Sequence, residues 1–191
     1  MIGLTVRLAG AGAMIAGAAL SLGAQTTITF SAGAGSAVAA QEAQKPTSDS
    51  GVKVVDFKKP GDVPLTELLK TEAAKATKAG MMPVVEFAAE WCGPCKKIAA
   101  SLGDARMIDA FSKVYIIRLD LDAWKPKLAD AGFTNVSGIP AFFPINAEGR
   151  PTGATITGAA WGEDIPENMA PPLKKFFEEQ RNKGATEKAK S

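Results

Sequence analysis

The two cysteines of the chain, Cys92 and Cys95, enclose Gly93-Pro94 and stand between a pattern typical of a buried strand and a pattern typical of a helix. Thiols three positions apart at the start of a helix share one face, so their sulfurs can reach the ~2.05 Å bond of a disulfide with little backbone movement. The motif therefore predicts dithiol–disulfide redox chemistry. We expect Cys92 to be the exposed, reactive thiolate, stabilised by the positive helix end, and Cys95 to be the more buried thiol that releases the product.

The composition limits what other chemistry the chain can perform. There is no histidine, which excludes His metal ligands and Ser–His or Cys–His catalytic pairs. Two cysteines cannot form a zinc cage, so we expect neither a metal nor a cofactor. The net charge of +2 argues against nucleic-acid binding. An inert structural disulfide stays an alternative, although a bridge closing so short a loop gains little from chain entropy.

The elements that must position the cysteines follow from the hydrophobic pattern. Apolar runs before the first cysteine and around 115–120 predict strands buried on both faces. Pro144, inside another apolar run, favours a sheet edge or a bulge. The element order predicts an α/β sandwich with a mixed sheet, parallel strands first and then a hairpin. In chain order we expect strand 52–57, helix 66–79, strand 82–88, helices 92–102 and 104–112, strand 115–120, helix 124–131, strands 141–146 and 153–158, and helix 172–182.

The N-terminal segment differs in composition from the rest of the 191 residues. Arg7, the weakly apolar run 8–24 and the small residues 37–40 favour a cleaved export signal, with an uncleaved membrane anchor or a Gly/Ala-rich leader as alternatives. The predicted organisation is an export signal or leader at 1–40, a linker at 41–51, one folded domain at 52–183 and a polar tail at 184–191. A cleaved signal predicts a periplasmic or secreted protein, and an uncleaved one a membrane-anchored protein.

The segment 84–97, VVEFAAEWCGPCKK, resembles the active-site stretch of the thioredoxin superfamily. Gly138-Ile139-Pro140, followed by an apolar strand, is similar to the cis-proline loop of the same superfamily. The pattern also resembles periplasmic thioredoxin-like reductase domains, including those attached to transmembrane electron carriers. The resemblance implies a thioredoxin-like α/β/α sandwich with a mixed central sheet and a cis-proline loop.

The resemblance also implies a role for each residue that matches the family pattern. Cys92 would be the attacking nucleophile and Cys95 the resolving thiol, while Gly93 and Pro94 between them would set the redox potential. Trp91 would be the aromatic residue of the contact face. Ile139 and cis Pro140 would form the loop that pairs with an extended substrate. Such pairing uses main-chain hydrogen bonds, so selectivity for client side chains would be low.

An acidic residue six positions before the first cysteine is usually Asp in the family, and here it is Glu86. If Glu86 is buried, its pKa is raised and it can accept the proton of the resolving thiol. The family often places a lysine on the adjacent strand, and the corresponding residue here is Arg118, which would pair with Glu86 and oppose the rise. The alternative is that both side chains face solvent.

The function that these features favour is a thiol-disulfide oxidoreductase that reduces protein disulfides outside the cytoplasm. Strong oxidants of this fold usually owe their potential to a histidine between the cysteines, which is absent here. The expected partners are disulfide-bearing client proteins and a membrane or soluble dithiol electron donor, and the expected state is a monomer. An exported disulfide oxidase or isomerase, and a non-enzymatic thioredoxin-fold binding module, stay open as alternatives.

Overall fold

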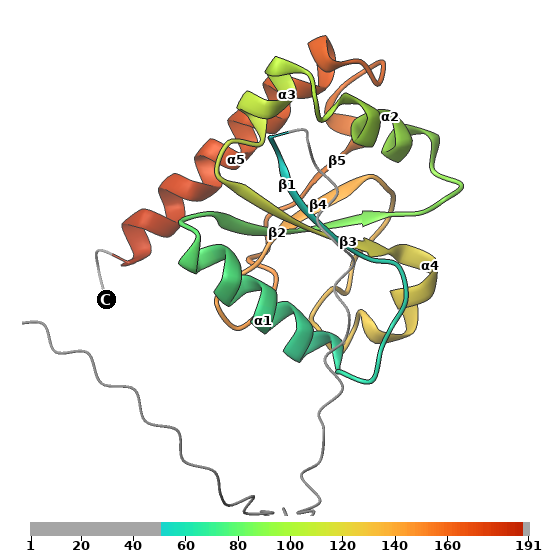
Figure 1. Cartoon of the computed structure of the whole chain (residues 1–191), viewed down its shortest axis with the longest axis vertical. Coiled ribbons are helices and arrows are strands. Elements are labelled where there is room, and N and C mark those ends of the chain that lie inside the picture. The colour runs from blue at the N-terminus through green and yellow to red at the C-terminus, as the bar shows by residue number, and fades with distance from the viewer. Residues whose placement is uncertain (1–50, 189–191) are drawn as a thin grey trace, which may run out of the picture. The chain divides into compact units, whose positions relative to one another are not determined.

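The computed structural model describes residues 51–188, and within them a five-stranded sheet forms the centre (Figure 1). The strand order is β1-β3-β2-β4-β5. Strands β1, β3 and β2 are parallel to one another, while β4 runs antiparallel to both β2 and β5. The expected mixed sheet, parallel first and then a hairpin, is therefore confirmed. The strands are β1 (Lys53–Phe57), β2 (Met82–Ala88), β3 (Val114–Asp120), β4 (Ala141–Pro144) and β5 (Ile156–Thr157).

Helices cover both faces of the sheet (Figure 1). Helices α1 (Leu65–Lys78) and α4 (Leu121–Trp124) pack on one face, and α2 (Gly93–Ser101), α3 (Ala105–Ala110) and α5 (Pro166–Lys188) pack on the other. Single-turn 3₁₀ helices follow α4 and β5, at Lys125–Lys127 and Gly158–Ala160. The sequence is consistent with this layering because successive side chains of a strand point to opposite faces.

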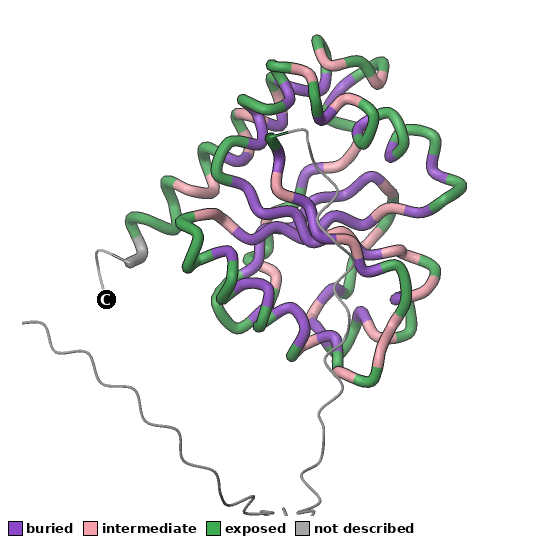
Figure 2. Tube along the Cα trace, in the orientation of Figure 1, coloured by how far each residue is buried: buried purple, intermediate pink, exposed green. Residues whose placement is uncertain are grey.

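Strand β3 shows why the central strands read as continuous apolar runs. Ile117 and Leu119 belong to the core on the α1 side, whereas Ile116 belongs to the core on the α5 side. All three are completely buried, and Figure 2 shows the buried trace running through the middle of the sheet. A strand covered on both faces needs apolar side chains at odd and even positions alike.

Three helix boundaries differ from the sequence-based expectation. Helix α1 begins at Leu65 after Pro64, so Thr66 is inside the helix and is not its N-cap. Helix α4 begins three residues before the expected Trp124 and is capped by Asp120, whose side chain accepts from the Ala123 amide.

Helix α5 begins at Pro166, six residues before the expected start, and contains Pro171 and Pro172. Both prolines lie beyond the first four residues of the helix, so each removes one intrahelical N–H···O bond. The buried side chains of Met169 and Leu173 hold this part of the helix on the sheet. The helix continues past residue 183, the predicted end of the domain, to Lys188.

Strand β5 has two residues and is shorter than the expected 153–158. It pairs with only Ala141 and Phe142 of β4. Pro144 is the register partner of Val84 in β2, and on its other side it lies beyond the part of β4 that pairs with β5, which is compatible with the local edge position that its sequence context favours. The β4–β5 connection turns at Gly149, which has a φ of +76° and lies directly against α1. A Cβ at Gly149 would lie 2.6 Å from the Lys70 backbone nitrogen, so only glycine fits there.

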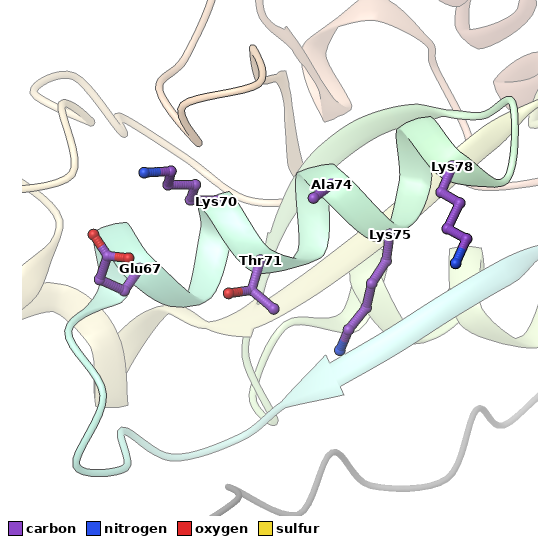
Figure 3. A pocket seen from close by; sticks show the side chains of 6 residues that line it. All are labelled: Glu67, Lys70, Thr71, Ala74, Lys75 and Lys78. Carbon is purple, nitrogen blue, oxygen red and sulfur yellow. The ribbon is translucent and has the colours of Figure 1, made fainter. Parts of the chain in front are cut away.

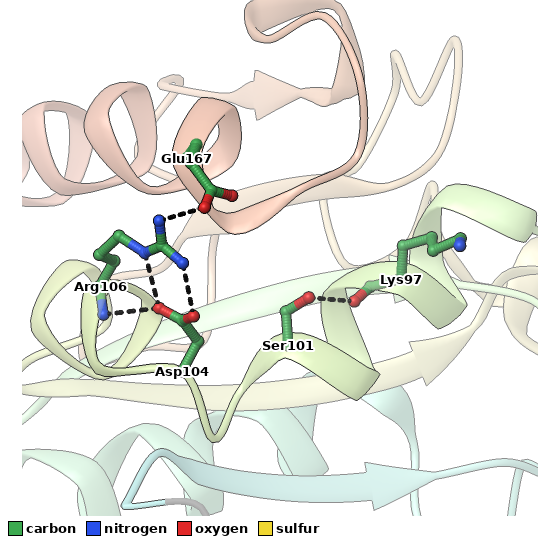
Figure 4. Close-up of polar contacts among 5 residues, drawn as sticks. All are labelled: Lys97, Ser101, Asp104, Arg106 and Glu167. Atoms are coloured by element: carbon green, nitrogen blue, oxygen red, sulfur yellow. Dashed lines mark hydrogen bonds and ion pairs between the residues drawn. The ribbon is translucent and has the colours of Figure 1, made fainter.

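Polar side chains join α3 to the start of α5 at the surface (Figure 4). Asp104 caps α3 by accepting from the Arg106 amide at 2.9 Å, as its position in the sequence predicts. The Arg106 guanidinium bonds the Asp104 carboxylate, holding the pKa of Asp104 down to about 2, and also pairs with Glu167 of α5. These contacts are solvent-exposed, so they contribute little to stability and chiefly fix the relative position of the two helices.

The predicted export signal and linker lie almost wholly outside the residues that the structure describes. Within residues 51–188, no helix combines the length and the apolar character needed to cross a membrane.

Candidate active site

Helix α2 places the two cysteines at its N-terminus. Cys92 is the N-cap residue in extended conformation, Gly93 is the first helical residue, and Pro94 follows in the first turn, where a missing N–H costs nothing. The cysteines form a disulfide with their Cα atoms 5.3 Å apart. The Cys95 amide donates to Cys92 Sγ at 3.1 Å, so the sulfur occupies the place of a capping oxygen. In the reduced protein this donor and the helix dipole would stabilise a thiolate on Cys92.

The burial of the two cysteines differs from the expectation. Cys92 is 2% exposed and Cys95 is 5% exposed, so the expectation of an exposed Cys92 beside a more buried Cys95 is wrong for this disulfide form. Both sulfur-bearing residues pack with Ala89, and Ile139 covers them from the opposite loop. Sequence spacing places a residue on a helix but does not tell which loop lies over it. Trp91, beside Cys92, is 66% exposed, and Gly93 and Pro94 between the cysteines are exposed as well.

The loop before β4 lies against the disulfide. The Ile139–Pro140 peptide bond is cis, as the sequence predicts, and Ile139 packs on the cluster of the two cysteines. The Pro140 carbonyl accepts from the Gly158 amide at 3.1 Å. A Cβ at Gly158 would lie 3.3 Å from Pro140 Cδ, so a small residue is favoured beside the cis bond. Gly158 was not singled out from the sequence, because only the sheet register brings it to this loop.

Trp91 is held from outside the motif by Asp122. Its indole Nε1 donates to Asp122 Oδ2 at 2.7 Å. Asp120 caps the following helix, which leaves the Asp122 carboxylate to orient the indole. Nothing in the linear sequence links two residues 31 positions apart, so this contact is a product of the fold.

Glu86 of β2 is completely buried and pairs with Arg118 of β3. The two residues are direct partners in the parallel register, and Arg118 Nε donates to Glu86 Oε2 at 2.8 Å. Burial raises the pKa of Glu86 above its ordinary value, and the charge and hydrogen bond of Arg118 offset part of the rise. The opposing effects proposed from the sequence are therefore both present.

A third charged residue, Asp56, lies in register with Glu86 and Arg118, and these three residues form a row across the sheet that the sequence did not indicate. Asp56 of β1 is the register partner of Arg118 on the other side, and its carboxylate lies 3.4 Å from Arg118 Nη1. The guanidinium thus lies between two carboxylates from the two neighbouring strands. The order β1-β3-β2 produces this row, and only the sheet topology could have revealed it.

A cavity of about 780 Å³ opens between the ends of the parallel strands and α2. Cys95, Arg118 and Asp56 belong to its wall. It lies at the carboxyl ends of the strands, where open α/β sheets usually bind their ligands or substrates. A second, more open hollow of about 460 Å³ lies along α1 (Figure 3), where its lining includes Lys70, Lys75 and Lys78 but neither cysteine.

The similarity of this chain to known proteins covers the segment that contains both cysteines and the Ile139–Pro140 loop. The family model described as Thioredoxin matches residues 68–171. The thiol:disulfide interchange protein TxlA of Synechococcus elongatus is 31% identical over 74 residues, which are 38% of this chain and 37% of that protein. Thioredoxin Asp f 28 of Aspergillus fumigatus is 30% identical over 84 residues, which are 44% of this chain and 72% of that protein. The chain thus spans little more than a third of the first relative.

Among solved structures, the disulphide isomerase of Xylella fastidiosa Temecula1 is 19% identical. The match covers 65% of this chain and 98% of that one, with a TM-score of 0.47.

Proposed function

Because the chain belongs to the thioredoxin family, we propose that it is a thiol-disulfide oxidoreductase that reduces protein disulfides through Cys92 and Cys95. The observation that carries this proposal is the Cys92–Cys95 disulfide at the start of α2, beside the cis Ile139–Pro140 bond. Supporting it, the matching part of one relative belongs to a protein named for thiol:disulfide interchange.

The proposed reaction begins with the reduced protein. The Cys92 thiolate attacks one sulfur of a client disulfide, forms a mixed disulfide and releases the first client thiolate, which takes a proton from solvent. Cys95 then gives its proton to the Glu86 carboxylate, directly or through water in the cavity, and its sulfur attacks Cys92 Sγ. The second client sulfur leaves as a thiolate and takes up the proton that Glu86 received, so the client has gained two electrons and two protons and the protein holds the Cys92–Cys95 disulfide. A dithiol donor then returns two electrons to the disulfide; one of the two protons it loses goes to Cys95 and the other to solvent.

The site geometry assigns the other residues their proposed roles. Ile139 and Pro140 would pair with an extended client segment, and exposed Trp91, fixed by Asp122, would form the rim of the contact face. Gly93 and Pro94 would set the redox potential through the conformation of the first turn of α2. Ile139 also packs against the cluster that holds the two cysteines, so a client segment paired with this loop would lie close to the sulfurs.

The direction of electron flow rests on the Gly-Pro pair between the cysteines. Thioredoxin has a potential near −270 mV, whereas protein disulfide isomerase lies near about −180 mV. We expect a potential below about −230 mV, measured by equilibration with glutathione or dithiothreitol buffers. A value above about −180 mV would favour the exported oxidase or isomerase instead.

An insulin-reduction assay tests the activity itself. The wild-type protein should reduce insulin with dithiothreitol as the donor, and Cys92→Ser should not. The Cys95→Ser variant should retain clients on Cys92 as mixed disulfides, whose identities would reveal the pathway. Wild-type turnover no faster than that of Cys92→Ser would instead favour a binding module that has kept the fold and the motif.

We further propose that the protein acts outside the cytoplasm, with residues 1–40 as its export signal. The basis is the sequence alone: Arg7, the apolar run 8–24 and the small residues before Gln41. Intact-mass measurement of the protein isolated from its native compartment tests this proposal. A mature chain beginning near Gln41 supports a cleaved signal, a full-length chain in the membrane fraction supports an anchor, and a full-length cytoplasmic chain contradicts export.

A further inference from the structure

The row Asp56–Arg118–Glu86 crosses three parallel strands, and its members Asp56 and Arg118 line the same cavity as Cys95. We propose that Asp56 is a positioning residue of this site: it shares the Arg118 guanidinium with Glu86 and thereby controls proton transfer between Glu86 and Cys95. The inference rests on the proposed oxidoreductase function and adds a residue that the cysteine motif does not indicate.

The geometry shows that Arg118 divides its hydrogen bonds between the two carboxylates. Its Nε bonds Glu86 Oε2 at 2.8 Å, and its Nη1 lies 3.4 Å from Asp56 Oδ1. Within the described residues, Glu86 Oε1 and Arg118 Nη2 have no hydrogen-bond partner. Glu86 therefore receives one bond and not the stronger two-bond contact that a guanidinium can give to a single carboxylate. Asp56 competes for the same cation from β1.

The three residues differ in their access to solvent, and this difference gives Asp56 its influence. The Glu86 side chain is 0% exposed, whereas those of Arg118 and Asp56 are 18% and 20% exposed. Arg118, Asp56 and Cys95 all line the same cavity. Of the two carboxylates in the row, Asp56 is thus the one whose charge can be altered from the solvent side without opening the core.

Other charged groups of the cavity wall also face this region. They come from the ends of β1, β2 and β3 and from α2 and α4: Lys58, Lys59, Glu90, Lys96, Asp120 and Asp122. Among the charged groups of the described residues, Arg118 and Asp56 act on the Glu86 carboxyl with opposite signs. The Arg118 cation lowers the pKa of the buried carboxyl, and the Asp56 anion raises it.

The sign of the expected effect follows. Removing the Asp56 charge leaves Glu86 as the one anion of the row that faces Arg118 and removes a neighbouring anion, and both changes favour ionised Glu86. Glu86 must be ionised to accept the Cys95 proton, so the rate of client reduction should fall at low pH where Glu86 is protonated. In the variant, this fall, the acid limb of the rate profile, should occur at a lower pH than in wild type. A single charge acting in partly hydrated surroundings should move it by about half a pH unit or more.

The experiment compares wild type and D56N, which keeps the size and the hydrogen-bonding oxygen of the side chain. Single-turnover reduction of a disulfide peptide by the reduced protein is followed from pH 5 to 9. Because Cys92 ionisation also produces an acid limb, the same pair is measured in an E86Q background. Asp62→Asn, an exposed acid in the loop after β1, is the matched control for net charge. Asp56→Glu is the conservative rescue.

The inference predicts a shifted acid limb for D56N, a wild-type limb for D62N and D56E, and no D56N shift when Glu86 is glutamine. A carbon-13 NMR titration of the Glu86 carboxyl in the reduced protein should show the same displacement without reference to activity. An unmoved limb in D56N, or an equal shift with and without Glu86, overturns the inference while leaving the oxidoreductase function intact. Loss of cysteine-dependent turnover in wild type would instead refute the proposed function.

Discussion

Replacing Glu86 by glutamine tests whether the buried carboxyl beside the dithiol costs stability. The side chain is completely buried, and one of its oxygens has no partner in the described part of the chain. Burial raises the folded-state pKa of Glu86 above its ordinary value of 4.5, despite the opposing Arg118 charge. The native state therefore keeps the proton at pH values where the unfolded chain has released it. The stability associated with this group is complete below about pH 4.5 and is lost as the pH rises through the folded-state pKa.

The glutamine variant removes this dependence because its amide stays neutral. We expect nearly equal unfolding free energies for wild type and E86Q at pH 4. The difference should then grow in favour of E86Q by at most about 1.4 kcal/mol per pH unit up to the raised pKa, and level off above it. Urea unfolding of both oxidised proteins from pH 4 to 9 measures the difference, with exposed Glu90→Gln as the control. Parallel wild-type and E86Q curves, or a variant that weakens as the pH rises, would refute this reasoning.

Three further predictions concern the scaffold and are checked by urea unfolding. Gly149→Ala should destabilise the protein by roughly 2–4 kcal/mol, because its Cβ would meet the Lys70 backbone at positive φ; an effect below about 1 kcal/mol would contradict the close approach. Tyr115→Phe should cost about 1–2 kcal/mol, since its buried hydroxyl bonds Glu72 at 2.7 Å. Lys113→Gly should stabilise by about 1 kcal/mol by relieving its φ of +58°; destabilisation would show that the side chain is needed.

The sequence predicts the order of elements and the chemistry of the cysteines because both depend on short-range patterns. Apolar runs predict strands that are buried on both faces, and the run 82–88 predicts strand β2 with the bounds that it has in the structure. The Cys92-Gly93-Pro94-Cys95 motif and Ile139-Pro140 indicate the disulfide and the cis bond through residues that are adjacent in the chain. Helix ends were less well predicted, because packing of Met169 overrides the tendency of Pro171 and Pro172 to end a helix.

The features that were missed all depend on long-range pairing. Asp56 reaches Arg118 only because β1 and β2 flank β3, and Asp122 reaches Trp91 across 31 residues. The recessed position of Cys92 likewise depends on Ile139, which comes from a separate loop. No local signal reports such contacts, since they are set by strand order and register.

The two buried acids of the described residues show how a structural carboxylate differs from one kept for chemistry. Both oxygens of Glu72 are bonded, one to Lys75 and one to the Tyr115 hydroxyl, so its charge is satisfied on the face away from the cavity. Glu86 has one oxygen bonded to Arg118 and the other without a partner among the described residues, and Arg118 lines the same cavity as Cys95. A carboxyl that only stabilised the fold would gain from a second partner, whereas a carboxyl that must take up and release a proton needs a vacant oxygen. The incomplete pairing of Glu86 is therefore the feature of the sheet that fits proton exchange with the dithiol.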